Sequence, residues 1–177
     1  MTQITRLLSL VFIITLAACA TPPTKDIAVE ADSDPKARLS GYKTYAWLAT
    51  AQIMFDPEGQ WEPRNVDIDA EVQLMINREL HNRGITEVAS NPDMLVAYAA
   101  GIDMTALELK ENPETKKKLL ENVPKAALII ALIDADTGFV IWLGQATGNV
   151  QQQTDESMVR ARIEYAVREM FRLLPES

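Results

Sequence analysis

The chain has 177 residues and a formal net charge of −8, from 17 basic and 25 acidic side chains. This length suffices for one domain with a single hydrophobic core. The acidic balance excludes nucleic acid as an expected partner, because its phosphates would be repelled, and argues against membrane binding through a basic patch.

The first 18 residues have the layout of a secretory signal. A polar start carrying Arg6 precedes an apolar run over residues 7–16, and small residues follow it. A positive start, a short apolar core and small residues before a cleavage site are typical of a signal peptide. The run is shorter than the roughly 20 apolar residues that a transmembrane helix needs.

The residues Leu16-Ala17-Ala18-Cys19 resemble the lipobox of bacterial lipoproteins. This resemblance implies cleavage before Cys19, diacylglycerol on its sulfur and an acyl chain such as palmitate on the new amino group. An ordinary signal peptide with a chance cysteine is the alternative. Alanine rather than aspartate at position 20 favours the outer membrane, by analogy with lipoprotein sorting. We therefore expect a lipid-anchored, periplasm-facing protein attached through Cys19.

Removal of residues 1–18 takes away one charged group, Arg6, and leaves 159 residues with a net charge of −9. Cys19 is the only cysteine, so lipidation would leave no thiol. The sequence therefore predicts no disulfide, no cysteine-based metal site and no cysteine nucleophile. Two or more lipid chains suffice for stable attachment.

Residues 19–38 contain Pro, Asp, Ala and Thr without an apolar period, and are expected to form a flexible tether. A single domain is expected over residues 39–177. Its first strand is predicted at 42–48, where aromatic and β-branched residues alternate. Residues 49–64 are expected to form a long loop whose Phe55 and Trp61 fold back onto the core. Trp61 as a ligand platform is the alternative.

A helix is predicted over residues 67–83, with Asp67 as its N-cap and Gly84 as its C-terminal stop. His81, the only histidine, lies off the apolar stripe in the last turn, and an exposed, non-catalytic histidine is expected there. The buried stripe consists of Ile68, Val72, Met75, Ile76 and Leu80.

An interior strand is predicted at residues 93–104, because both of its faces are apolar or small. Residues 109–124 then turn polar, and a short surface helix is expected in this connection. Its lysines at 116–118 are fewer than the four to eight typical of lipid recognition.

A β-hairpin is predicted from strands at 126–134 and 139–147, joined by turn-forming residues at 134–138. We expect this hairpin at the centre of the sheet, with Trp142 buried. The aspartates at 134 and 136 suggest a calcium loop, but the downstream positions carry none of the required ligands. They are instead expected to accept hydrogen bonds from the turn.

The last predicted helix spans residues 155–174 and has one apolar stripe. Two helices with single stripes each need one partner surface. The predicted fold class is therefore α+β, with two layers: a mostly antiparallel four-stranded sheet and two main helices packed on one face.

The mature chain also resembles the bacterial lipoproteins of domain-of-unknown-function family 4136. The matching segments are residues 42–47, 92–98 and 133–146. The resemblance runs from about Leu39 to Pro175 and departs at residues 126–128 and Leu143. It implies a compact α+β lipoprotein domain and carries no assigned activity.

The sequence shows no motif for common enzyme chemistry, and the one open route is a pair of carboxylates, which nothing in the sequence assigns to a cleft. It has one histidine, no Gly-x-Ser-x-Gly motif and no glycine-rich phosphate loop. We therefore expect no enzyme, no cofactor and no metal, and only Cys19 as a modified site. The leading hypothesis is a non-catalytic binding or accessory module, with an envelope protein as a candidate partner. The alternative is a carrier or sensor of a small apolar ligand or lipid, using Trp47, Trp61 or Trp142, and a hydrolase is the least favoured reading.

Overall fold

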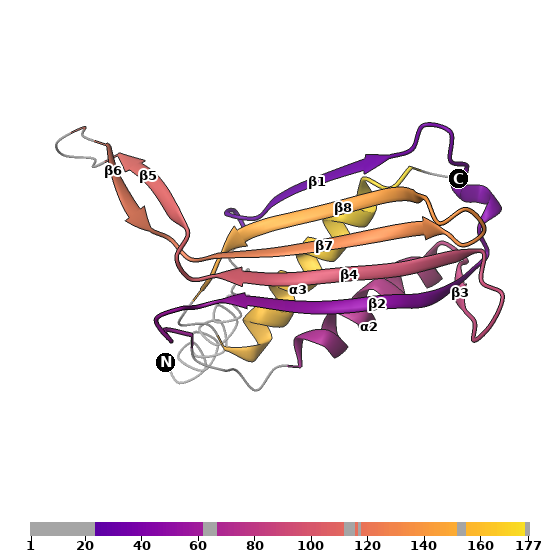
Figure 1. The fold of residues 1–177 in the computed structure, drawn as a ribbon, viewed down its shortest axis with the longest axis horizontal. Coiled ribbons are helices and arrows are strands. Elements are labelled where there is room, and N and C mark those ends of the chain that lie inside the picture. The colour runs from indigo at the N-terminus through magenta and orange to yellow at the C-terminus, as the bar shows by residue number, and fades with distance from the viewer. Residues whose placement is uncertain (1–23, 62–66, 112–115, 117, 152–154, 176–177) are drawn as a thin grey trace, which may run out of the picture.

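The computed structural model describes residues 24–61, 67–111, 116, 118–151 and 155–175 (Figure 1). Strands and helices alternate irregularly along the chain, as in α+β proteins. In chain order they are β1 (Ala28–Ser33), a 3-10 turn (Leu39–Gly41), β2 (Thr44–Phe55), α2 (Ile68–Asn82), β3 (Thr86–Glu87), β4 (Met94–Asp103), β5 (Leu107–Glu111), β6 (Lys118–Asn122), β7 (Lys125–Asp134), β8 (Val140–Asn149) and α3 (Glu156–Arg172).

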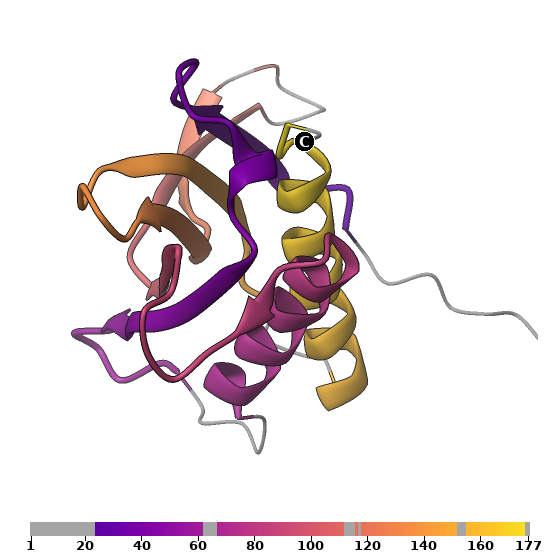
Figure 2. The same ribbon diagram turned by 90° about the vertical axis from the view of Figure 1, so that its right-hand side faces the viewer.

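The main sheet has six strands in the order β1-β8-β7-β4-β2-β3, so the expected four-stranded sheet is wrong in number. The two additional strands, β1 and β3, lie at its edges. Strand β2 runs parallel to β3 and β4, and the other pairs are antiparallel. Helices α2 and α3 both pack on one face of the sheet (Figure 2), which confirms the α+β class and the two-layer arrangement.

Strand β1 corrects the expected tether over residues 19–38. Its exposed and half-buried residues alternate, and Val29 and Ala31 pack against the core. It pairs with β8 along its whole length, from Ala28 opposite Thr147 to Ser33 opposite Trp142. The chain is therefore part of the sheet from Ala28 onward. The first residues of the expected tether, 19–23, lie outside the described residues.

Strand β2 is also longer than expected, because it continues to Phe55 through half of the predicted loop. It pairs with β4 as far as Asp103, which is opposite Phe55. Phe55 is 55% exposed, so the expectation that it folds back onto the core is wrong. Part of the remaining loop, residues 62–66, lies outside the described residues.

The prediction of a surface helix within residues 109–124 is also wrong. Strands β5 and β6 form an antiparallel hairpin there, with Leu109 opposite Leu120. Leucines at 107 and 109 alternate with charged residues, which is a strand period rather than a helical one. We call this hairpin, residues 107–122, the arm, because it projects from the end of the sheet (Figure 1).

The two helices begin at capping aspartates and close to the predicted residues. The Asp67 carboxylate accepts a hydrogen bond from Ala70 N at 3.0 Å, and Asp155 accepts one from Met158 N at 2.8 Å. Each cap satisfies an amide that the first helical turn leaves unpaired. After α2, Gly84 takes a positive φ of 75°, as expected for a helix stop.

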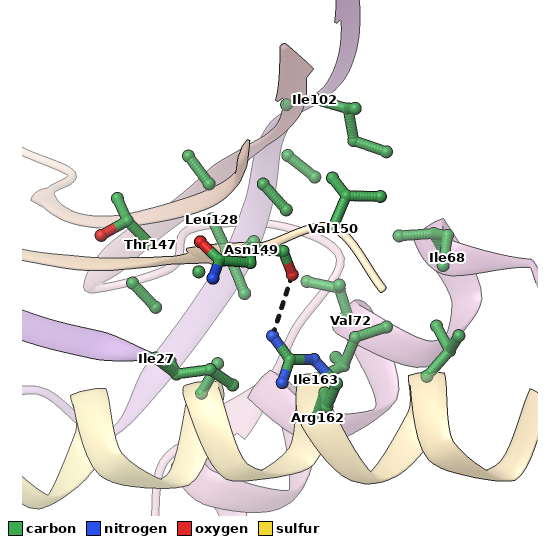
Figure 3. Close-up of a pocket in the computed structure, with 18 of the residues that line it drawn as sticks. Ile27, Ile68, Val72, Ile102, Leu128, Thr147, Asn149, Val150, Arg162 and Ile163 are labelled. Atoms are coloured by element: carbon green, nitrogen blue, oxygen red, sulfur yellow. Dashed lines mark hydrogen bonds between the residues drawn. The ribbon is translucent and has the colours of Figure 1, made fainter. Parts of the chain in front are cut away.

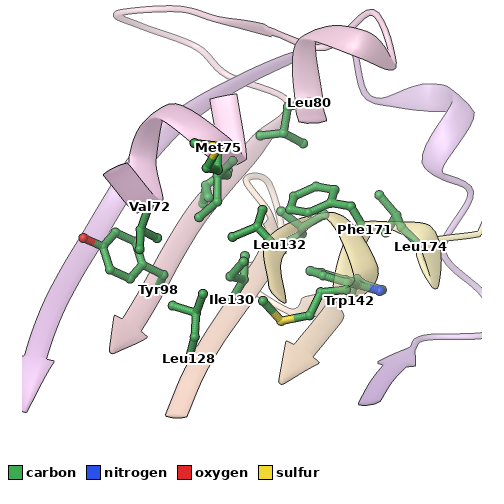
Figure 4. Close-up of a cluster of buried hydrophobic side chains, with 14 of the residues drawn as sticks. Val72, Met75, Leu80, Tyr98, Leu128, Ile130, Leu132, Trp142, Phe171 and Leu174 are labelled. Atoms are coloured by element: carbon green, nitrogen blue, oxygen red, sulfur yellow. The ribbon is translucent and has the colours of Figure 1, made fainter. Parts of the chain in front are cut away.

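Trp142 is fully buried in the core, as predicted, with 0% of its surface exposed. Its ring contacts Phe171 of α3 at a centroid distance of 5.3 Å, next to Ile130 and Leu132 from β7 (Figure 4). Strands β7 and β8 occupy interior positions in the sheet. The predicted hairpin therefore supplies much of the surface against which the helices pack.

Candidate ligand-binding groove

An apolar groove opens between the sheet and the helices, near the starts of α2 and α3 (Figure 3). Its volume is about 430 Å³, within the usual range for small-molecule sites. Side chains from both layers line it, including Trp61, Ile68, Val72, Ile102, Leu128 and Ile163.

The groove exists because the helix-facing side of the sheet changes from large to small side chains along its length. Toward one end, Trp142, Leu132 and Met94 fill the space under the helices. Toward the other end, the same face carries small residues from three neighbouring strands. These residues are Ala100, Ala126, Ala146 and Gly148. Small side chains leave the two layers apart, and apolar neighbours then line the space between them.

One corner of the groove is polar and is held by a paired arginine. Arg162 of α3 donates to both carboxylate oxygens of Asp26, each at 2.8 Å, and to Asn149 O at 3.1 Å. Asn149 N donates to the same carboxylate at 2.8 Å. The hydrogen bonds from Arg162 lower the pKa of Asp26 to about 2, so the carboxylate stays ionised at neutral pH.

This pairing has a chemical consequence for the groove. A bidentate arginine–carboxylate pair satisfies much of the hydrogen-bonding capacity of both groups and cancels their charge. The corner therefore offers little net attraction to an anionic headgroup. The groove as a whole suits an uncharged, apolar molecule or the hydrocarbon part of a larger one.

A separate aromatic cluster joins β2 to β4 next to α2. The Trp47 ring meets the rings of Tyr45 and Tyr98 edge-on, at centroid distances of 6.3 and 6.1 Å. The Tyr45 hydroxyl donates to Asn77 Oδ1 at 2.6 Å, and the Tyr98 hydroxyl donates to Asp69. Burial raises the pKa of Tyr45 to about 12 and raises that of Tyr98 further. Both hydroxyls are therefore protonated hydrogen-bond donors that fix the helix to the sheet.

The three tryptophans considered as ligand contacts have different positions. Trp61 lines the groove, and its backbone N–H donates to Asp56 Oδ2 at 2.7 Å, which holds the loop in place. Trp47 belongs to the aromatic cluster, and Trp142 to the closed part of the core. Only Trp61 among the three is thus placed at the groove.

The other residues singled out in the sequence have structural positions. His81 is exposed in the last turn of α2, as expected. Asp134 accepts hydrogen bonds from Thr137 N at 2.7 Å and from the Tyr42 hydroxyl at 2.7 Å, so its predicted role in the turn is confirmed. The Thr137 hydroxyl also donates to Asp134, at 2.6 Å, and this hydrogen bond, followed by that from Tyr42, lowers the pKa of Asp134. Cys19 lies outside the described residues.

The groove was not predicted from the sequence. The small residues at alternate positions near the ends of three strands are visible in the sequence. That they lie side by side on one face follows only from the order and register of the strands in the sheet. Within the residues that the structure describes, no three His, Cys, Asp or Glu side chains are grouped to hold a metal ion. In the same part of the chain, no helix has the length and hydropathy needed to cross a bilayer.

Comparison with known proteins agrees with this architecture. The family model described as "Domain of unknown function (DUF4136)" matches residues 29–176. A solved DUF4136 family protein from Bacteroides thetaiotaomicron superposes with a TM-score of 0.55 at 13% identity, over 85% of this chain and 97% of that one. This likeness shows the fold alone.

Two further solved structures match more weakly. A PelC dodecamer from Paraburkholderia phytofirmans gives a TM-score of 0.46 at 16% identity, over 81% of this chain and 96% of that one. A minor lipoprotein from Acinetobacter baumannii gives 0.36 at 11% identity, over 76% and 93%. No functionally curated protein matches the chain.

Proposed function

The chain belongs to the DUF4136 family, and we propose that it is a lipid-anchored envelope protein that works as a non-catalytic binding module. In this proposal Cys19 carries the lipid, the domain faces the periplasm at the outer membrane, and the groove takes an apolar ligand. The observation that carries the binding role is the apolar groove itself, which small side chains leave between the two layers and which has a paired arginine at one corner.

The ligand class follows from the size and lining of the groove. A space of about 430 Å³ can accommodate a small apolar molecule or a length of a single hydrocarbon chain. Its lining is dominated by Ile, Val, Leu and Ala side chains, with Trp61 as an aromatic wall. Because Arg162 is neutralised by Asp26, a charged headgroup would remain in solvent while the apolar part entered.

Binding can be tested with the full chain carrying Cys19→Ser, so that no attached lipid competes. The probe is N-phenyl-1-naphthylamine, an uncharged apolar fluorophore. We expect saturable binding with energy transfer from tryptophan, and weaker transfer in the Trp61→Phe variant, because Trp61 alone among the three tryptophans lines the groove.

A pair of variants on β4 separates the groove from the rest of the surface. Ala100→Leu would fill the groove, whereas Ala97→Leu adds the same atoms to the helix-free face of the same strand. We expect Ala100→Leu to abolish probe binding and Ala97→Leu to retain it. Equal binding by both folded variants would show that the groove is not the site.

A second candidate function, contact with an envelope protein, is favoured by the arm. Leu107, Leu109 and Leu120 on it are 64%, 59% and 67% exposed. Leu109 and Leu120 are directly opposite each other, which makes an apolar patch on a projecting hairpin. A photo-cross-linking residue at Leu109 in intact cells should capture one stoichiometric protein. The same residue at Phe139, which is similarly exposed on another loop, should not. Capture of the same proteins from both positions would argue against this function.

A further inference from the structure

The outer edge of β2 is open over most of its length. Strand β3 covers only Thr44 and Tyr45, and in the described part of the chain no strand pairs beyond them on that side. We call residues 48–55 the open edge. An uncovered strand edge presents backbone donors and acceptors that another strand can pair with.

The backbone groups that face outward can be identified from the pairing on the other side. Phe55 O accepts a hydrogen bond from Met104 N, so Phe55 directs its backbone groups toward β4. Alternate residues of a strand direct these groups to opposite sides. Thr50, Gln52 and Met54 therefore direct their N–H and C=O groups away from the sheet.

The side chains of the open edge lack the usual protection against pairing. Natural edge strands commonly carry charged residues or proline, but the segment from Ala46 to Phe55 contains neither. Ile53, Met54 and Phe55 are each more than half exposed. In a chain with a net charge of −8, this segment can approach another copy without placing like charges opposite each other.

The sequence of the open edge is complementary to itself in one antiparallel register. With Gln52 opposite Gln52, Ile53 lies opposite Ala51 and Met54 lies opposite Thr50. Phe55 likewise lies opposite Ala49, so Ile53, Met54 and Phe55 each face a smaller side chain. A shift of the pairing by two residues in either direction would place Phe55 opposite Trp47, or Ile53 opposite Ile53. Two large side chains would then face each other. Only registers with an even shift bring outward-facing backbone groups together.

The described residues around the open edge leave room for this arrangement. Beyond Phe55 the chain leaves the strand in a turn, where Gly59 N donates to Asp56 O at 3.3 Å. In the Gln52-centred register, the partner's Phe55 lies opposite Ala49, four residues from Tyr45. The partner strand therefore turns away before it reaches β3.

We propose that two copies of this chain associate through β2, antiparallel and centred on Gln52, to form one continuous sheet across a two-fold axis. The contact is isologous, as in most symmetric dimers. Its small area makes it weak in dilute solution. Confinement of both copies on a membrane would raise its occupancy. Because Gln52, Ile53 and Met54 of the open edge also line the groove, the pairing is tested without a groove ligand.

Cysteine substitution tests the register in the full chain carrying Cys19→Ser. Opposed residues in a hydrogen-bonded pair have Cα atoms about 5.5 Å apart, which a disulfide can span. We expect Gln52→Cys to form a disulfide-linked dimer on mild oxidation. Thr50→Cys is the matched control, because two copies of residue 50 would lie about 13 Å apart along the strands. Mixing Thr50→Cys with Met54→Cys should restore the cross-link.

Charge substitution tests the same contact without a covalent bond. Because Gln52 faces itself, Gln52→Lys and Gln52→Glu should each weaken self-association about five-fold, and an equimolar mixture should recover it as a heterodimer. Sedimentation of concentrated samples measures this, with circular dichroism confirming the fold. Cross-linking of Thr50→Cys as efficient as that of Gln52→Cys, no cross-link in any variant, or unchanged association of the two charge variants would each overturn the proposal.

Discussion

The ring of Trp142 covers Gly144, two residues further along the same strand. A Cβ on Gly144 would lie only 2.8 Å from the ring carbon Cζ2. Both residues face the helices, so the glycine provides the space in which the largest buried side chain lies. A strand glycine usually weakens a sheet, and here the close approach of the ring accounts for it.

The Gly144→Ala variant should therefore be destabilised, by about 1–3 kcal/mol, because the added methyl group displaces a ring that is enclosed on all sides. Chemical denaturation measures the loss. Gly101→Ala on β4 is the control, since its Cβ would meet no atom closer than Ile53 O at 3.6 Å. Equal loss in both variants would indicate a general effect of alanine in these strands.

Truncation of the same ring should have a larger effect. Trp142→Ala should reduce the free energy of unfolding by about 3–5 kcal/mol, because it leaves a cavity between β8 and Phe171. Phe139→Ala, at a position that is 72% exposed, should change it little. A melting temperature for Trp142→Ala equal to that of the unaltered chain would contradict the packing described here.

The Asp26–Arg162 pair predicts a pH dependence of stability. The pKa of Asp26 is about 2 in the folded chain, below its ordinary value near 3.9, so folding favours the ionised form. Its contribution, about 1–2 kcal/mol after allowance for solvent screening, is fully present above pH ~4 and is lost as the pH falls toward 2.

This dependence can be measured by comparing Asp26→Asn with the unaltered chain in urea, from about pH 7 down to about pH 2. The difference in unfolding free energy should shrink to near zero at the acid end. Glu30→Gln, on the exposed side of β1, should show no such convergence. A difference that stayed constant with pH would mean that the carboxylate charge does not contribute.

The lipid anchor at Cys19 remains a prediction. Cys19→Ser should give a soluble or unprocessed protein, because the sulfur that receives the diacylglycerol is gone. Ala20→Asp is the matched control and should stay lipidated but fractionate with the inner membrane. Mass spectrometry of the terminal peptide identifies the acyl chains. An unmodified terminal peptide in a membrane fraction that does not change would refute lipid attachment.

The strongly patterned elements were predictable from the sequence. The two helices carry single apolar stripes and capping aspartates, and the central hairpin has a nearly continuous apolar strand followed by turn residues. Such signals are local. The packing of Trp142 followed from them, because a large aromatic residue on an interior strand has few places other than the core.

The elements that were missed depend on contacts between distant segments. In β1, alanine, valine and serine give only a faint alternation, and pairing with β8 stabilises the strand. The second half of β2 was predicted as loop because Pro57 and Gly59 follow it closely, and its pairing with β4 exists only in the folded sheet. The groove arises from small residues on three strands that become neighbours only in the folded sheet. None of these features is encoded in one window of sequence.

The arm lies outside the main sheet, and the pairing of the main sheet does not depend on it. Asp103 and Lys125, which flank it, are direct partners across β4 and β7, so the sheet is already closed where the arm leaves it. The side chains buried at its base, Met104 and Val123, are not members of the main core. A short turn in place of residues 104–124 would preserve the register of every strand in the main sheet. The arm, with its exposed leucines, is therefore not needed to pair or to close the main sheet.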